Sequence, residues 1–163
     1  MISQLIFLFI LILLNAYFAA TEIAFISLND AKIEKQAKEG NKKAKQIKKM
    51  LKNPSKFLAT IQIGITLAGF LSSAFASDTF AGMLAPVLNQ WMPFISITAW
   101  QNISIVIITI ILSFFTLVFG ELVPKRLAMK YYEKISFATI SVIKIISIIT
   151  APFVKLLTWA TNI

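Results

Sequence analysis

The chain has 163 residues, of which 58% are apolar and 14% are charged, and its mean hydropathy is +0.79. Soluble domains carry about a quarter of charged residues, so most of this chain is expected to lie in lipid. The sequence contains no cysteine and no histidine. This composition excludes disulfides, thiolate or imidazole metal sites, thiol chemistry and histidine-dependent catalysis.

The net charge of +9 is distributed unevenly. Ten lysines fall between Lys32 and Lys56, and four more cations fall between Lys125 and Lys134. No cation precedes Lys32, and none lies between residues 57 and 123. Because basic residues collect on the cytoplasmic side of a membrane, this pattern predicts a cell-membrane protein with several spans. A lipid bilayer, and not nucleic acid, is the expected partner of the positive charge.

The first apolar block, residues 2–27, is long enough to span a bilayer as a helix. No cation precedes it, so it is predicted to be a spanning helix and not a cleavable secretory signal. The N-terminus is then outside and Lys32 is inside. A basic helix hairpin is expected over residues 30–53, with Asn29 or Asp30 as a cap and an interruption at Glu39-Gly40-Asn41.

Two further spans are predicted at about 57–77 and 102–121, joined by an outer loop over 78–101 that contains Gly82, Pro86 and Pro93. Pro54 is placed near the start of the second span.

The segment 125–163 is apolar but carries Lys144, which is costly at the centre of a lipid-facing span. We therefore expect interfacial or re-entrant helices here, with a fourth span as the alternative. The predicted fold is one domain, 1–163. It is an all-α membrane protein with three transmembrane helices, a cytoplasmic helix hairpin and interfacial belt helices.

Each predicted span carries a stripe of small or oxygen-bearing residues at helical spacing. The stripes are Asn15, Ala19 and Glu22; Gln62, Thr66, Gly69 and Ser73; and Thr109, Ser113, Thr116 and Gly120. Such stripes commonly serve helix packing. The alternative is a polar pathway between the spans.

Two carboxylates, Glu22 and Glu121, favour the pathway, because an ionisable residue within a span is by default a functional candidate. Pro124 has no N–H, so in a regular helix it leaves the carbonyl of Gly120 without its partner. A freed carbonyl beside a carboxylate and hydroxyls is an oxygen cluster suited to Mg²⁺, Ca²⁺ or Na⁺. The structural alternatives are that Glu22 reaches the membrane interface or caps a neighbouring helix, and that Pro124 simply ends its helix.

Three segments together resemble a known family. They are the run Asn15-Ala16-Tyr17-Phe18-Ala19-Ala20-Thr21-Glu22, then Asn53-Pro54 with Leu58 to Leu67, and finally Gly120-Glu121-Leu122-Val123-Pro124-Lys125. In this order, and over essentially the whole chain, they resemble the transmembrane domain of the CNNM/CorC (cyclin M) magnesium transporters. The last segment is the most specific of the three.

The resemblance implies a homodimer of three-span domains in which a dehydrated Mg²⁺ is held between the helices and moved outward, with Na⁺ as the proposed coupling ion. It also implies cytoplasmic CBS-pair and CorC-type domains in the full-length chain.

This sequence departs from the family where many members carry side-chain ligands. Ala19 stands where many members carry a serine on the first span. On the second span many members carry asparagines after the glycine that matches Gly64, whereas this chain has Ile65, Thr66 and Gly69 there. Either backbone carbonyls, Thr66 or Glu22 must then take the place of the missing side-chain ligands, or this chain binds another ion or binds the same ion with another affinity. The predicted metal-site residues are therefore Glu121, Gly120, Thr66 and Glu22, with the position of Ala19.

The leading functional hypothesis is Mg²⁺ efflux through this site. A second hypothesis is a membrane anchor or regulatory scaffold without transport of its own, and a third, membrane disruption, rests on the amphipathic lysine hairpin. Two distant carboxylates are the only acid–base candidates, and no phosphate loop or nucleophile pattern is present. We therefore expect the chain not to be an enzyme.

Overall fold

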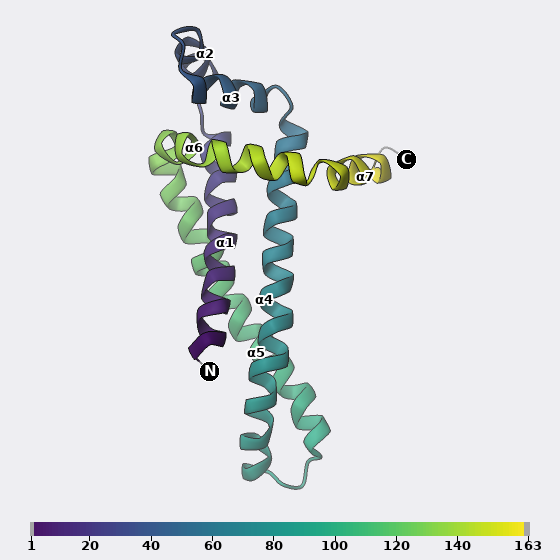
Figure 1. Ribbon diagram of the computed structural model, residues 1–163. Coiled ribbons are helices and arrows are strands. Elements are labelled where there is room, and N and C mark those ends of the chain that lie inside the picture. The colour runs from purple at the N-terminus through teal and green to yellow at the C-terminus, as the bar shows by residue number, and fades with distance from the viewer. Residues whose placement is uncertain (1, 162–163) are drawn as a thin grey trace.

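The computed structural model describes the backbone of residues 2–161 and the side chains of these residues except 78 and 161. Within that range the chain is helical, without strands (Figure 1). The elements are α1 (Ile2–Ile26), α2 (Asp30–Lys38), α3 (Lys42–Leu51), α4 (Pro54–Trp91), α5 (Ile97–Leu117), the π-helix η1 (Val118–Leu122), α6 (Val123–Ile149) and α7 (Ala151–Thr161).

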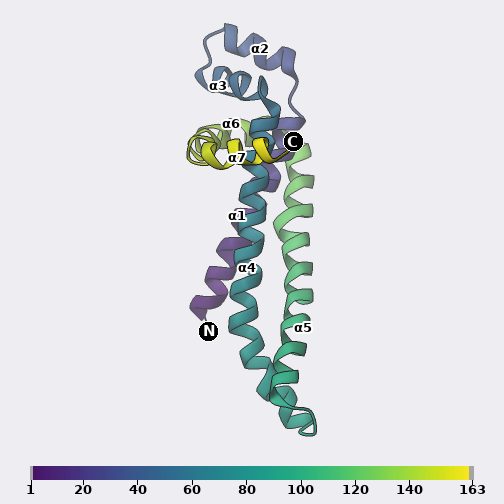
Figure 2. The ribbon, with the colours of Figure 1, turned by 90° about the vertical axis from the view of Figure 1, so that its right-hand side faces the viewer.

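Helices α1, α4 and α5 run along one common axis (Figures 1 and 2). The start of α1 and the α4–α5 turn lie toward one end, and the α2–α3 hairpin lies at the other, which we call the basic end. Helix α6 first continues α5 and η1 along the axis. It bends at Tyr131, whose φ of −119° and ψ of 29° are not helical, and its second half runs across α1 and α4.

Three helical stretches among the described residues are long and apolar enough to cross a membrane: Ile2–Ile26, Pro54–Trp91 and the continuous run Ile97–Ile149. Their outward faces carry large apolar side chains such as Phe70, Ile110 and Phe114, as a lipid environment requires. The predicted fold class, an all-α membrane protein with three spanning helices, is confirmed. Lys144 lies on the transverse half of α6 and is exposed, so it is not in a fourth helix parallel to the other three.

The expected outer loop over 78–101 is wrong for most of its length. Helix α4 continues to Trp91, and α5 begins at Ile97 after a turn in which the Ser96 side chain accepts a hydrogen bond from the amide of Ala99. Pro86 lies inside α4, and the carbonyl that loses its helical donor there, four residues earlier, is that of Gly82. Gly82 and Pro86 were interpreted as loop residues but lie within α4, whereas Pro93 lies in the turn that follows this helix.

The hairpin is built as its local signals indicate. Asn29 caps α2 by accepting from the amide of Lys32, and Asn41 caps α3 by accepting from the amides of Lys43 and Ala44. Gly40 lies between them with a φ of +98°, a value that side chains disfavour.

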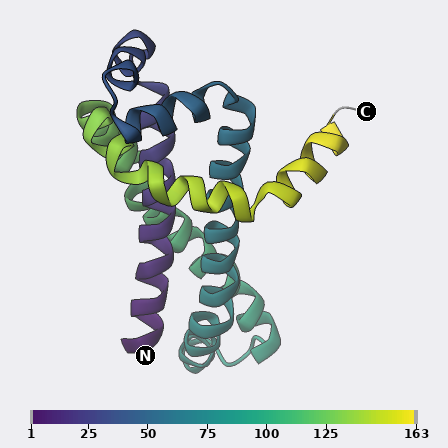
Figure 3. The same cartoon turned by 45° about the horizontal axis from the view of Figure 1, so that its top comes forward.

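A buried cluster joins the hairpin to α1, α4 and the transverse half of α6. It consists of Phe18, Phe25, Ile33, Ile47, Phe57, Ile61, Ile140 and Ile143. The main apolar core therefore lies at the basic end, and the same packing fixes the position of α6 relative to α1 (Figure 3).

Candidate functional site

The π-helical segment η1 sits where α5 meets α6. It contains Gly120 and Glu121, and the amide of Val123 donates to the carbonyl of Val118, five residues earlier. In a regular α-helix the ring of Pro124 would clash with the Gly120 carbonyl, and the wider turn relieves that clash. Segments of this kind are frequent at functional sites.

Gly120 packs directly against α1. It is buried, and a Cβ added to it would lie 3.1 Å from Nδ2 of Asn15 and 3.5 Å from the carbonyl oxygen of Ile12. The Asn15 side chain, 4% exposed, donates a hydrogen bond of 3.1 Å to the Gly120 carbonyl. The carbonyl that Pro124 releases is therefore bound by an amide from a neighbouring helix.

Two buried oxygens have no partner. Oδ1 of Asn15 belongs to this contact, and Oγ1 of Thr116 lies on α5 one turn before Gly120; neither makes a hydrogen bond with the described residues. A buried acceptor without a donor costs about 1–3 kcal/mol. Each of these atoms can therefore accept a bond from a donor or bind a cation.

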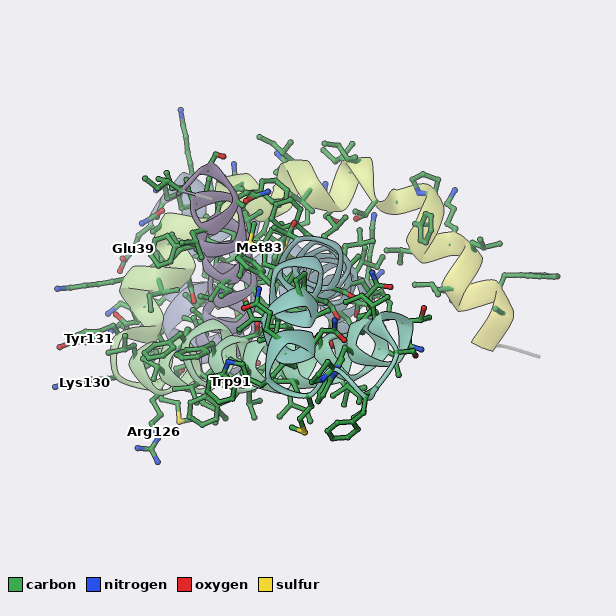
Figure 4. All side chains as sticks on the ribbon, turned by 90° about the horizontal axis from the view of Figure 1, so that it is seen from below. Glu39, Met83, Trp91, Arg126, Lys130 and Tyr131 are labelled. Atoms are coloured by element: carbon green, nitrogen blue, oxygen red, sulfur yellow. The ribbon has the colours of Figure 1, made fainter. Side chains whose placement is uncertain are left out.

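Two carboxylates meet one ammonium group beside this contact. Nζ of Lys125 donates to Oε1 of Glu121 at 2.7 Å and lies 3.4 Å from Oε2 of Glu22. The three side chains are 33% (Glu121), 21% (Glu22) and 23% (Lys125) exposed. Their formal charges sum to −1, so the cluster retains excess negative charge. The neighbouring cations Arg126 and Lys130 point away from the bundle (Figure 4).

The structure brings three of the predicted site residues together: Glu22, Gly120 and Glu121. Ala19 is fully buried on α1, between Asn15 and Glu22 along the helix, and its methyl group supplies no ligand. Among the described residues no group of three acidic, cysteine or histidine side chains forms a metal cluster. A cation bound here would therefore need amide, hydroxyl or carbonyl oxygens beside the two carboxylates.

Thr66 does not join this cluster. It lies on α4, which packs mainly against α1 and α5, and its hydroxyl is 3.4 Å from the Nε2 donor of Gln62 on an exposed face of that helix. The contact of α4 with α1 instead uses Gly64, where an added Cβ would lie 2.6 Å from the ring of Phe18.

Sequence reasoning missed two residues of this region, one in the contact with Gly120 and one in the cluster. Asn15 was placed on the first polar stripe but not among the ligands, although it precedes Glu22 by two helical turns. Lys125 was used only as a marker of topology, although it follows Glu121 by one turn. That spacing indicates an ion pair.

The far side of the cluster is apolar. A cavity of about 470 Å³ lies between α1, α4 and α5, and its wall includes Ile12, Phe80, Leu112 and Phe119. Ile12 and Phe119 are neighbours of Asn15 and Gly120 on their helices. The polar groups are therefore separated from the far end of the bundle by apolar side chains in this structure.

The fold and the cluster define a multi-pass helical membrane domain with a paired-carboxylate site. The family described as the cyclin M (CNNM) transmembrane N-terminal domain matches residues 5–163, and the chain belongs to this family.

Curated relatives agree with this assignment. The UPF0053 protein sll0260 of Synechocystis is 38% identical over 98% of this chain and 35% of its own length. The UPF0053 inner membrane protein YfjD of Escherichia coli is 30% identical over 91% of this chain and 31% of its own. A polyamine export protein of Haemophilus influenzae is 24% identical over 88% of this chain and 33% of its own length. The chain thus spans about a third of the length of these relatives.

Proposed function

We propose that this domain is the membrane part of a cation transporter and that its cargo is Mg²⁺, moved out of the cell. The observation that carries the proposal is the convergence of Glu22 and Glu121 on one cation position, beside the Asn15–Gly120 contact. The basic end is assigned to the cytoplasm by its lysines, so the cluster lies near the cytoplasmic entrance of the bundle.

The donor set suits a hard cation. Mg²⁺ takes six oxygen ligands and usually keeps several waters. Two carboxylates, Oδ1 of Asn15 and Oγ1 of Thr116 supply acidic and neutral oxygens, and the last two have no other partner within the described residues. Thr66 remains a proposed ligand only if α4 shifts toward η1 during transport.

Lys125 has a specific role in this proposal. Its ammonium neutralises one of the two negative charges, whereas Mg²⁺ neutralises both. Binding of Mg²⁺ therefore displaces Lys125, which competes with Mg²⁺ for the two carboxylates and holds them together when no Mg²⁺ is bound.

Export of a divalent ion against an inside-negative potential costs about 4.6 kcal/mol per 100 mV, from roughly 2.3 per elementary charge. We propose an inward Na⁺ gradient as the source.

The direct test is calorimetric titration of the purified protein with Mg²⁺ in sodium-free buffer, comparing wild type with Glu121→Gln. The control is Glu39→Gln, which removes the same charge from the exposed hairpin turn. We expect saturable binding by wild type and the control, and at least about a tenfold loss in Glu121→Gln. Equal binding by both variants would remove Glu121 from the site.

A second cargo is favoured by one observation: the two carboxylates already bind an alkylammonium group, that of Lys125. A relative named as a polyamine export protein carries a related domain. We therefore propose organic polyamines as the alternative cargo. Spermidine titrated in place of Mg²⁺ separates the two, because a polyamine site binds spermidine with higher affinity and is not saturated by Mg²⁺.

The scaffold alternative makes the opposite prediction. A membrane anchor would show neither Mg²⁺ nor spermidine flux in proteoliposomes, and substitutions at Glu22 and Glu121 would change only stability.

We also propose the homodimer that the family resemblance implies. The exposed face of α4 around Gln62 and Thr66 is available for a second copy, and cross-linking of a cysteine introduced at position 66 tests it.

A further inference from the structure

A second cavity, lined in part by charged residues, lies at the basic end, away from the carboxylate cluster. Its volume is about 450 Å³, and it is an open cavity lined by α3, the first turn of α4 and the transverse half of α6. Figure 3 shows these three segments next to one another. The cavity is lined by four lysines, Lys45, Lys49, Lys56 and Lys144, and by no acidic residue.

The four lysines carry unbalanced charge. None of them forms an ion pair or a side-chain hydrogen bond with the described residues. By contrast, Lys32, Lys38, Lys48 and Lys125 each pair with a glutamate. Like charges that converge on one space repel each other unless an anion lies between them. The cavity is therefore built for a negatively charged group.

The N-terminus of α4 adds to this preference. Asn53 lines the cavity but makes no side-chain cap, unlike Asn29 and Asn41 at the starts of α2 and α3. Pro54 has no N–H and the amide of Phe57 donates to the Asn53 carbonyl, so the amides of Ser55 and Lys56 are those without a side-chain cap beside the four lysines. Free amides at a helix N-terminus favour phosphate and similar anions.

The cavity also has an apolar side. Met50, Phe57 and Ile148 complete part of its wall, and Ile148 continues into the exposed apolar residues Ile145 and Ile149 of α6. That half of α6 runs across the spanning helices, as a helix in the membrane surface would. An occupant would therefore meet cations on one side and lipid chains on the other.

We propose that this cavity binds the phosphate group of an anionic phospholipid, with the acyl chains against the exposed apolar residues of α6. Basic pockets on the cytoplasmic side of transmembrane helices bind such headgroups. A lipid fits better than a free phosphate, because only a lipid uses the apolar wall. The proposal is independent of the cargo, since none of these residues belongs to the Glu22–Glu121 cluster.

The test compares short-chain phosphatidylglycerol with phosphatidylcholine of the same chain length, added to the detergent-purified protein. Bound lipids are counted by native mass spectrometry, and the unfolding temperature is recorded in parallel. The variant replaces Lys45, Lys49, Lys56 and Lys144 with glutamine. The matched control replaces the exposed lysines Lys35, Lys42, Lys134 and Lys155, so both proteins lose the same charge.

We expect wild type and the control to retain phosphatidylglycerol preferentially and to be stabilised by it. The cavity variant is expected to lose at least about tenfold in affinity. Equal loss in both variants would overturn the proposal, because it would show attraction by net charge alone. Stabilisation by inorganic phosphate at the same concentration as the lipid would overturn the lipid assignment and indicate a site for a soluble anion.

If the fourfold variant fails to fold, the single variants Lys49→Gln and Lys144→Gln decide the outcome, since they lie on α3 and α6 and share only the cavity. Each is expected to weaken phosphatidylglycerol binding about threefold to tenfold. Wild-type binding by both would contradict the proposal. Mg²⁺ binding is expected to be unchanged in every one of these variants.

Discussion

The two charged regions of the molecule differ in how their charge is balanced. At the α1–η1 contact, Glu22 and Glu121 share the ammonium of Lys125 inside the chain. In the basic cavity, four lysines have no partner among the described residues. Charge within a span is costly unless it is paired, whereas cations at the membrane surface can use lipid headgroups. We propose on this basis that the first region exchanges one cation for another and that the second binds an anion from outside the chain.

The largest effect is expected from a larger side chain at the contact between η1 and α1. Gly120→Val places a branched side chain against Asn15, where even a Cβ would lie 3.1 Å from Nδ2. Overpacking of this kind costs about 1–3 kcal/mol. We expect a lower unfolding temperature and loss of cation binding. Gly69→Ala is the control, since no atom lies within 4 Å of its added Cβ, and it should be neutral or slightly stabilising.

The next effect comes from the amide that binds the Gly120 carbonyl. Asn15→Ala leaves this buried carbonyl without its side-chain partner, at a cost of about 1–3 kcal/mol. The expected result is a lower unfolding temperature together with weaker Mg²⁺ binding, because the variant also loses Oδ1. An unchanged unfolding temperature would show that the hydrogen bond contributes little to the packing of α1 on η1.

Removing the ammonium group of Lys125 should increase the excess negative charge of the carboxylate cluster, and with it the difference in charge between the two regions. Lys125→Gln leaves Glu22 and Glu121 facing each other without a counter-ion, so we expect Mg²⁺ to bind about tenfold more tightly, equivalent to about 1.4 kcal/mol. The control Lys130→Gln removes a nearby cation that points away from the bundle. Weaker binding in Lys125→Gln, measured by calorimetry, would mean that the lysine supports the site instead of competing for it.

The smallest effect is expected in the hairpin. A hydrogen bond from Lys48, together with the charge of Lys38, lowers the pKa of Glu34 below its ordinary value. The resulting stabilisation is present above the ordinary glutamate pKa and is lost as the pH falls through the lowered one. Glu34 is exposed, so the change is small. After correction for the intrinsic pH dependence of amide exchange, the protection of α2 and α3 amides should fall on acidification in wild type, and Glu34→Gln should remove that fall.

The sequence predicted the parts of the fold that depend on local signals. Asn29, Asn41 and Gly40 mark the hairpin through capping and turn chemistry, and apolar blocks mark the spans. The end of α4 was missed because Gly82 and Pro86 favour a loop locally, whereas the helix runs through both residues to Trp91. No local sequence signal distinguishes a loop from a continuing helix at these positions.

The candidate site was predicted only where one segment contains the information. Gly120, Glu121 and Pro124 are adjacent, so the released carbonyl could be deduced from the sequence. The meeting of Glu22 with Lys125 depends on how α1 packs against η1 and α6, contacts between residues about a hundred positions apart. For the same reason Thr66, assigned from the family resemblance, lies outside the cluster: its face of α4 is not turned toward η1.

The most direct test of the central claim is a double-mutant cycle on the two carboxylates. Mg²⁺ affinity is measured in sodium-free buffer for wild type, Glu22→Gln, Glu121→Gln and the double variant. One shared site predicts that each single variant binds at least about tenfold more weakly and that the double variant is scarcely worse than either. Wild-type affinity in Glu22→Gln, or losses that simply add, would contradict a site formed jointly by Glu22 and Glu121.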